Sequence, residues 1–291
     1  MKSIRVRKCG QTVIAWLLVT IVASSPFARA GEKLKPEEVV ARHRESIGAA
    51  ETRASIKSRI ITGTVVATFR APGTGQVGGR VVLASHGEKS MVGMIFDNST
   101  NYPHEKIGFD GKDVSVSYVR PGVRSTLGDF LLTHKTVVSL GLLGGALSES
   151  WPLSNLSEKK GRLESDGTKK IGDRQAYEIK YFPRGGSDLR VSLFFDAQTF
   201  RHVRTEYART LSAQMGTTPD ASARRSETRY KMVEDFSEFG KEGGLTLPHK
   251  YKIYLELTGQ GGSFRAEWEM TFSGFSFNQR IDPNSFDVDG N

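Results

Sequence analysis

The sequence predicts a mainly β protein with few helices (α+β), built as a curved antiparallel sheet or incomplete antiparallel β-barrel. Three observations support this prediction. Apolar residues recur with a period of two over most of the chain after residue 56, turn residues such as Asp-Gly and Gly-Gly separate the periodic runs, and few residues lie between consecutive runs. Such short connections favour hairpins, and hairpins join antiparallel strands.

The first thirty residues are expected to be a signal peptide. A basic stretch ends at Lys8, an apolar core covers residues 12–23, and Ala28-Arg29-Ala30 stands before Gly31. We expect cleavage between Ala30 and Gly31, with a retained N-terminal anchor as the alternative. The remainder, residues 31–291, is then expected to be a single domain in the periplasm.

Composition excludes several classes of protein. Hydrophobic residues make up 37% of the chain, too many for a disordered protein. Of the 41 Lys and Arg residues, five lie in residues 1–30, which contain no acid, so the rest of the chain has 36 cations against 32 acids, a net charge of +4. This small excess does not predict a nucleic-acid-binding protein. The one cysteine, Cys9, would leave with the signal peptide, so no disulfide or thiolate site is expected.

One amphipathic helix is expected over residues 37–47. Pro36 stands near its first turn, acids follow at its N-terminus, and Gly48 ends it. The residues that share its apolar face are Val39, Val40, His43 and Ile47.

Strands are expected over most of the remaining chain. Alternation is clearest after Phe264, where Trp268 and Met270 alternate with Glu267 and Glu269, which is typical of a strand with one dry and one wet face. The twelve expected strands are residues 56–69, 77–85, 90–96, 107–109, 114–120, 162–165, 175–181, 189–195, 201–207, 228–239, 245–258 and 264–277.

Residues 127–147 interrupt this pattern and are expected to form two short helices. The segment is apolar but too long for a strand, and Asp129, His134 and Lys135 break it up, so a transmembrane span is not predicted. We interpret the segment as a helical lid over the dry face of the sheet.

An apolar cavity between lid and sheet would accept acyl chains, because each buried CH₂ contributes about 0.8 kcal/mol. The candidate lid residues are Leu131, Leu132, Val137, Val138, Leu140, Leu142 and Leu143, and the candidate strand residues are Met91, Met94, Phe96 and Trp268. A well-filled core without a cavity predicts the same alternation of residues, so both interpretations stay open at this point.

No motif predicts catalysis, a cofactor or a metal. The G-x-G-x-x-G match at residues 73–78 leads into a strand rather than a helix, and the six histidines are scattered without a close pair. A hydrolase that uses two strand carboxylates is an alternative, although their alternation with apolar residues favours solvated faces. The acids concerned are Glu178, Glu206, Glu256, Glu267 and Glu269.

The order of elements resembles the periplasmic outer-membrane lipoprotein-sorting carrier (LolA-like) superfamily. Four segments carry the resemblance: Ile107-Gly-Phe-Asp-Gly-Lys-Asp-Val114, Leu193-Phe-Phe-Asp-Ala-Gln-Thr-Phe-Arg-His-Val-Arg204, Leu247-Pro-His-Lys-Tyr251 and Ile281-Asp-Pro-Asn-Ser-Phe286. The resemblance implies an unclosed barrel around helices, a hydrophobic cavity for the acyl chains of lipoproteins or another lipid, and no catalytic residue, cofactor or metal. A donor protein at the inner membrane and an acceptor at the outer membrane would be its partners.

The resulting hypothesis is a monomeric, soluble periplasmic carrier whose lid swings aside for acyl chains. Two alternatives from other classes remain. The first is a non-catalytic envelope module with a filled β core that binds a protein through its sheet edge or through the loop at residues 217–225. The second is the cell-wall or lipid hydrolase described above.

Overall fold

The computed structural model describes residues 34–155, 161–212, 227–259 and 262–289, which all belong to one compact unit, Lys33–Asn291. The expected signal peptide with its cleavage site at Ala30 and Gly31, and the loop at residues 217–225, lie outside the described residues. Within the described part, no helix is long and apolar enough to cross a membrane.

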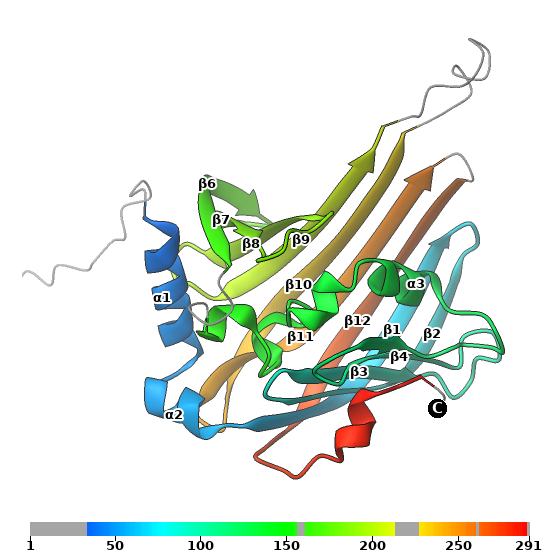
Figure 1. The fold of residues 1–291 in the computed structure, drawn as a ribbon, viewed down its shortest axis with the longest axis horizontal. Helices are drawn as coiled ribbons and strands as arrows, with labels where there is room; N and C mark the ends of the chain where they lie inside the picture. The colour runs from blue at the N-terminus through cyan, green and yellow to red at the C-terminus, as the bar shows by residue number, and fades with distance from the viewer. Residues whose placement is uncertain (1–33, 156–160, 213–226, 260–261, 290–291) are drawn as a thin grey trace, which may run out of the picture. The chain divides into compact units, whose positions relative to one another are not determined.

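Twelve antiparallel strands of the described residues form one curved sheet, as the sequence predicts (Figure 1). Their order is β5-β4-β3-β2-β1-β12-β11-β10-β9-β8-β7-β6. The strands are β1 (Ser58–Ala71), β2 (Gly75–His86), β3 (Lys89–Ile95), β4 (His104–Phe109), β5 (Val114–Val116), β6 (Arg162–Ile171), β7 (Arg174–Phe182), β8 (Arg190–Asp196), β9 (His202–Leu211), β10 (Thr228–Glu242), β11 (Leu245–Gly259) and β12 (Gly262–Phe277).

The sheet consists of two meanders joined by its first and last strands. Strands β1 to β5 pair in chain order, as do β6 to β12, and the two halves meet where β1 pairs with β12 from Arg59 opposite Phe277 to Ala71 opposite Arg265. Strands β5 and β6, which follow one another in the chain, therefore stand at opposite edges of the sheet. The segment that connects them has to cross one face of the sheet.

The alternation of buried and exposed side chains along the strands distinguishes the two faces of the sheet. Val65 and Ala67 of β1 pair with Met270 and Trp268 of β12, and all four side chains are buried. We call the face that carries them the inner face. The outer face carries their neighbours, among them Val66, which is 38% exposed.

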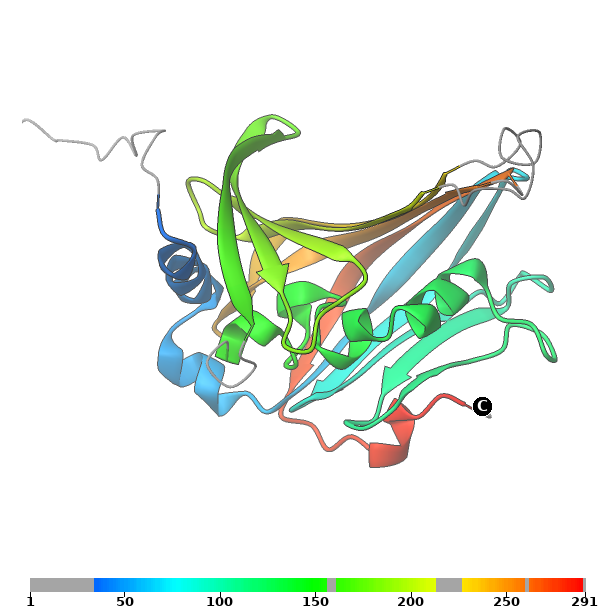
Figure 2. The ribbon, with the colours of Figure 1, turned by 45° about the horizontal axis from the view of Figure 1, so that its top comes forward.

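The connecting segment contains α3 (Thr126–Thr133), α4 (Thr136–Ser139) and two 3-10 turns, η1 (Gly145–Leu147) and η2 (Pro152–Asn155). We call residues 126–155 the lid segment. Figures 1 and 2 show it lying against the inner face, with β6 to β9 curving round one side of it. The prediction of two short helices is confirmed, and the helical region continues past residue 147.

Two further helices precede the sheet. Helix α1 (Pro36–Ile47) matches the prediction and buries the four residues expected to form its apolar face. Helix α2 (Ala50–Ser55) was not predicted, because it has six residues and buries none of them, so it lacks an apolar stripe. A last 3-10 turn, η3 (Pro283–Phe286), packs against β3 and β4.

Several predicted strand ends are wrong: β4 begins at His104 instead of Ile107, and β9 ends at Leu211 instead of Tyr207. Two others have a visible cause. Strand β6 was expected to stop at Ser165 before an Asp166-Gly167 turn, but it continues to Ile171, because Gly167, with φ +84°, forms part of a bulge in the pairing with β7. Strand β5 was expected to reach Arg120 and ends at Val116; Arg120 instead forms a bridge with Val123 across a turn.

Gly79→Ala is expected to destabilise the sheet by about 2 kcal/mol, because overpacking a close contact forces the backbone to shift. A Cβ at Gly79 would lie 2.1 Å from the carbonyl oxygen of Ile95 and 2.9 Å from Cδ1 of Phe96. Urea unfolding measures the change. The matched control is Gly78→Ala on the same strand, where nothing lies within 4 Å of the new Cβ, and its effect should stay within about 0.5 kcal/mol. Equal effects at both positions would contradict this packing.

Candidate functional site

The lid segment lies on the inner face with most of its candidate residues buried. Five of them belong to the buried core, and the other two are partly buried against it. The buried ones are Leu131, Val137, Val138, Leu142 and Leu143, and the partly buried ones are Leu132 and Leu140. The segment therefore covers apolar surface, while its own apolar side chains are covered by the sheet.

The four candidate strand residues do not all lie beneath the lid segment. Met94, Phe96 and Trp268 are buried in the core. Met91 is half-buried, and its Sδ lies with the Cγ1 atom of Val82 over Gly93, on the opposite side of β3 from Met94. Met94, Phe96 and Trp268 could therefore line a site on the inner face of the sheet, whereas Met91 could not.

The contact between lid segment and sheet leaves little free space. One cavity of about 10 Å³ is bordered by Leu83, Val138 and Leu143, and another of about 10 Å³ is bordered by Ala146, His202 and Phe236. A volume of this size is about the least that holds one water molecule. Neither of these two cavities could hold an acyl chain unless the lid segment were displaced.

A buried carboxylate anchors the middle of the lid segment. The backbone N–H of Gly144 donates to Oε1 of Glu234 on β10 over 2.8 Å. Tyr207 and Tyr251, from the neighbouring strands, donate their hydroxyls to the same carboxylate over 2.6 and 2.5 Å. Burial raises the pKa of Glu234 to about 7, against the effect of these three hydrogen bonds, which favour the charged form.

A second buried carboxylate lies beneath the start of α3. Tyr102 donates its hydroxyl to Oε2 of Glu105 over 2.7 Å and accepts the indole N–H of Trp268 over 2.9 Å. Burial raises the pKa of Glu105 to about 7. Helix α3 approaches closely at Gly128, where a Cβ would lie 3.1 Å from Oε1 of Glu105 and 2.6 Å from a methyl of Val116.

An arginine holds the C-terminal part of the lid segment. Arg59, near the start of β1, donates from Nη1 to the carbonyl oxygen of Ala146 over 2.6 Å, and its Nη2 lies 2.9 Å from Oε2 of Glu149. The backbone N–H of Glu149 also donates to Oγ of Ser85 on β2 over 2.9 Å. Three polar contacts therefore connect η1 and the residues after it to β1 and β2.

A histidine and tryptophan cluster fixes the end of the lid segment to α1. Trp151 donates its indole N–H to Nε2 of His43 over 3.2 Å, and Nδ1 of His43 lies 3.1 Å from the carbonyl oxygen of Phe200. The ring of His202 stacks on Trp151 with 4.8 Å between centroids. Burial lowers the pKa of His43 to about 4 and lowers that of His202 well below its usual value, so both rings are neutral near pH 7.

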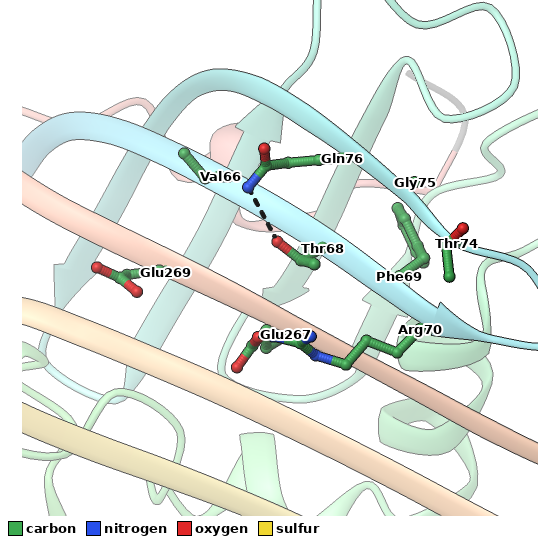
Figure 3. A pocket seen from close by; sticks show the side chains of 9 residues that line it. All are labelled: Val66, Thr68, Phe69, Arg70, Thr74, Gly75, Gln76, Glu267 and Glu269. Atoms are coloured by element: carbon green, nitrogen blue, oxygen red, sulfur yellow. Dashed lines mark hydrogen bonds and ion pairs between the residues drawn. The ribbon is translucent and has the colours of Figure 1, made fainter.

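The outer face holds a wide depression of about 750 Å³ near the β1–β2 hairpin. Among its polar side chains, Arg70 pairs with Glu267 and Gln76 donates to Thr68 over 3.3 Å (Figure 3). The depression lies on the other side of the sheet from the lid segment and carries no buried unpartnered polar group, so we do not assign it a function.

The strand carboxylates considered for a hydrolase are mostly held by cations. Glu206 pairs with Arg204 and Glu256 with Arg265 on the outer face. Glu178, which was expected on a solvated face, is only 3% exposed and lies 2.7 Å from Nζ of Lys169. The two carboxyls with raised pKa, those of Glu105 and Glu234, are fully buried in separate tyrosine clusters rather than facing one open cleft.

Metal ligands do not gather in the described part of the chain, where no three His, Cys, Asp or Glu side chains come close enough to hold an ion. His134 of the lid segment, for example, has a single carboxylate partner, Asp188, whose other partner is Arg209.

Sequence reasoning missed the polar anchors of the lid segment. Glu234 stands between Met232 and Phe236 in an alternating strand, and this position alone places its carboxyl on the inner face. Glu105 stands in the same relation to Ile107. Arg59 has no comparable signal, because only the tertiary structure brings it to Ala146.

Comparison with known proteins finds likeness in three-dimensional structure alone. No protein-family model matches the chain, and no curated sequence matches it. It is similar to the crystal structure of a LolA superfamily protein from Nitrosomonas europaea, with 14% identity over 87% of this chain and 97% of that one and a TM-score of 0.47. A DUF1329 family protein from Desulfovibrio piger has 10% identity over 86% and 95% of the two chains and a TM-score of 0.47.

A third similar structure is a putative outer membrane lipoprotein-sorting protein domain from Vibrio parahaemolyticus. It has 13% identity over 85% of this chain and 97% of that one, with a TM-score of 0.40. The first and third of these structures bear the names of the superfamily that the sequence resembles.

Glu234→Gln is expected to flatten the dependence of stability on pH. Because burial raises the folded-state pKa of Glu234 from 4.5 to about 7, the folded state binds more protons than the unfolded state between these values. The free energy of unfolding therefore falls as pH rises through this window, and glutamine, which does not titrate, removes that loss. Urea unfolding at pH 5 and pH 8 should show the wild type losing on the order of 2 kcal/mol more than the variant.

The quantity to compare is the difference in the pH dependence of stability between the wild type and Glu234→Gln. His43 and His202 have lowered pKa values and act in the opposite direction, so their contribution to stability rises with pH up to their unfolded-state value of 6.5. Glu105 acts in the same direction as Glu234. Subtraction removes these shared contributions, and equal slopes for variant and wild type would show that Glu234 does not titrate in this window.

Proposed function

We propose that this chain is a soluble periplasmic carrier, without catalytic activity, that binds acyl chains of lipoproteins or of another lipid between the lid segment and the inner face of the sheet. The observation that carries the proposal is the way in which the lid segment is attached. It covers apolar sheet surface with apolar side chains, but it forms no strand pairing with the sheet and is held by separate polar contacts.

These contacts are of a kind that can break and re-form. The N–H of Gly144 meets Glu234, the carbonyl of Ala146 meets Arg59, and Trp151 meets His43. Each hydrogen bond, when formed, contributes a net free energy of about 1 kcal/mol to the stability of the structure. Displacing the lid segment would leave the twelve-stranded sheet intact, since none of its ladders includes residues 126–155.

Acyl chains would replace the apolar side chains that the lid segment withdraws. Each CH₂ group buried on the inner face contributes about 0.8 kcal/mol, and the apolar side of the displaced segment becomes exposed in return. The affinity is the difference between these terms, which keeps binding reversible. Reversible exchange suits a carrier that takes its cargo from an inner-membrane donor and gives it to an outer-membrane acceptor.

One observation favours a second candidate function. The two cavities beside the lid segment hold about 10 Å³ each, as expected for a filled core. A non-catalytic envelope module that binds a protein partner would need no more space than this. The two functions differ in whether the lid segment opens.

Joining the lid segment to the sheet should abolish acyl-chain binding. Ser85→Cys and Glu149→Cys, in a Cys9→Ser background, place a cysteine pair where Oγ of Ser85 and the backbone nitrogen of Glu149 lie 2.9 Å apart. The probe is 11-(dansylamino)undecanoic acid, whose fluorescence rises in an apolar site. We expect saturable binding when the pair is reduced and its loss when the pair is oxidised, because the closed interior has no room for the chain.

The reduced form of the same variant is the matched control, since it differs only by the disulfide. Equal binding in both redox states would show that the probe binds elsewhere. Absence of binding in both states and in the wild type would instead favour the interaction module.

A further inference from the structure

A hollow of about 550 Å³ lies where α1 and α2 meet the end of the lid segment and the β2–β3 turn. Four cations from three stretches of chain border it, against two acids. The cations are Arg44 of α1, Arg53 of α2, Lys57 and Arg59, and the acids are Glu88 and Glu149. We call this hollow the basic cleft. It borders the lid segment and shares Ile47 and Ala146 with one of the two small cavities beneath it.

Three of the cations form no salt bridge with another described residue, although Arg53 lies near Glu45 and Glu51 and donates from Nε to the carbonyl oxygen of Gly48 over 3.0 Å. No described carboxylate lies within ion-pair distance of Arg44, Arg53 or Lys57. Burial lowers the pKa of Arg53, and the charge of Arg44 lowers it further, against the opposing effect of Glu45 and Glu51. The cleft therefore brings like charges together in a place where an anion would be stabilised.

Arg59 at the wall of the cleft is only partly satisfied. Its side chain is 6% exposed, Nη1 donates to the carbonyl of Ala146, and Nη2 lies 2.9 Å from Oε2 of Glu149. Nε of Arg59 and Oε2 of Glu149 are both buried without a hydrogen-bond partner. Glu149 is 20% exposed and therefore reaches the surface of the cleft. The lid segment thus supplies an anion to Arg59 and leaves one donor of the guanidinium fork unused.

We propose that the basic cleft binds a phosphate group, which takes the place of Glu149 at Arg59. A phosphate has several acceptor oxygens on one atom, so it can engage Nε and Nη2 of Arg59 together, and it has oxygens left for Lys57 and Arg53. The carboxylate of Glu149 has two oxygens and is fixed to the lid segment. Ile47 and Trp151 also border the cleft, but both are almost fully buried.

Replacement of Glu149 would loosen the lid segment. The ion pair with Arg59 is one of the contacts that hold residues 146–149 to β1, and a phosphate that takes it over removes that contact. A lipid headgroup in the cleft would then favour admission of its own acyl chains beneath the lid segment. This coupling rests on the proposed function, whereas the phosphate site itself does not.

Calorimetric titration of the full chain with inorganic phosphate at low ionic strength tests the site directly. Arg44→Gln combined with Lys57→Gln should weaken binding about tenfold, because it removes two exposed cations of the cleft without touching its buried residues. The matched control is Lys231→Gln combined with Arg280→Gln, which removes two exposed cations elsewhere and should change affinity less than twofold. Equal weakening by both pairs, or no binding to the wild type, would overturn the proposal.

Glu149→Gln is expected to strengthen phosphate binding, which is the opposite of the effect expected for the Arg44 and Lys57 double variant. Glutamine keeps the length and hydrogen-bonding capacity of the side chain but removes the anion that competes for Arg59, so phosphate should bind at least about threefold more tightly. A merely structural role for Glu149 predicts unchanged or weaker binding, and either result would exclude the replacement of Glu149.

Two short-chain lipids separate the possible sources of the phosphate. Dihexanoyl phosphatidylglycerol should bind more weakly to the Arg44 and Lys57 double variant than to wild type, while uncharged dihexanoylglycerol should bind both equally. This pattern identifies a lipid headgroup. Binding of inorganic phosphate without binding of either lipid would retain the phosphate site, with the free anion as its source, and would contradict the acyl-carrier function.

Discussion

The pairing of β1 with β12 is the constraint on which the rest of the structure depends. It joins two meanders into one sheet and sends β5 and β6, which are consecutive in the chain, to opposite edges. The connection between them has to cross a face of the sheet, and it can do so only if it is apolar enough to lie on Val65, Trp268 and their neighbours. Sheet topology thus requires a crossing, and the buried apolar side chains of the lid segment place it on the inner face.

Polar groups buried under the lid segment give this crossing a defined course. A segment held by apolar contacts alone can slide, because such contacts have no direction. Hydrogen bonds to Glu234 and Arg59 fix Gly144 and Ala146 at particular points of the sheet. The cost of burying Glu234 is reduced by its tendency to be protonated near neutral pH and by two tyrosine hydroxyls. These contacts define one position of the lid segment on the sheet.

The sequence alone predicts the local structure but not the contacts between residues that lie far apart in the chain. All twelve strands, helix α1 and the helical nature of residues 127–147 follow from periodicity and turn residues, because those signals are local. The order of strands does not, since nothing in β1 indicates that its partner is β12, some two hundred residues later. For the same reason Arg59 was not expected at the lid segment. Glu234 could have been found from its place between Met232 and Phe236, whereas the filled interior depends on side-chain packing that alternation does not specify.

The late arrival of β12 has a consequence for biogenesis. Arg59 at the start of the sheet pairs with Phe277, so the hydrogen-bonding edge of β1 stays open until Phe277, some two hundred residues later, has been made. Contacts between residues so far apart slow folding, because a long loop has to close first. An incomplete chain would present β1 as an exposed strand edge able to pair with other chains. Binding by general chaperones during this interval would therefore matter more for this protein than for one whose sheet is completed by neighbouring hairpins.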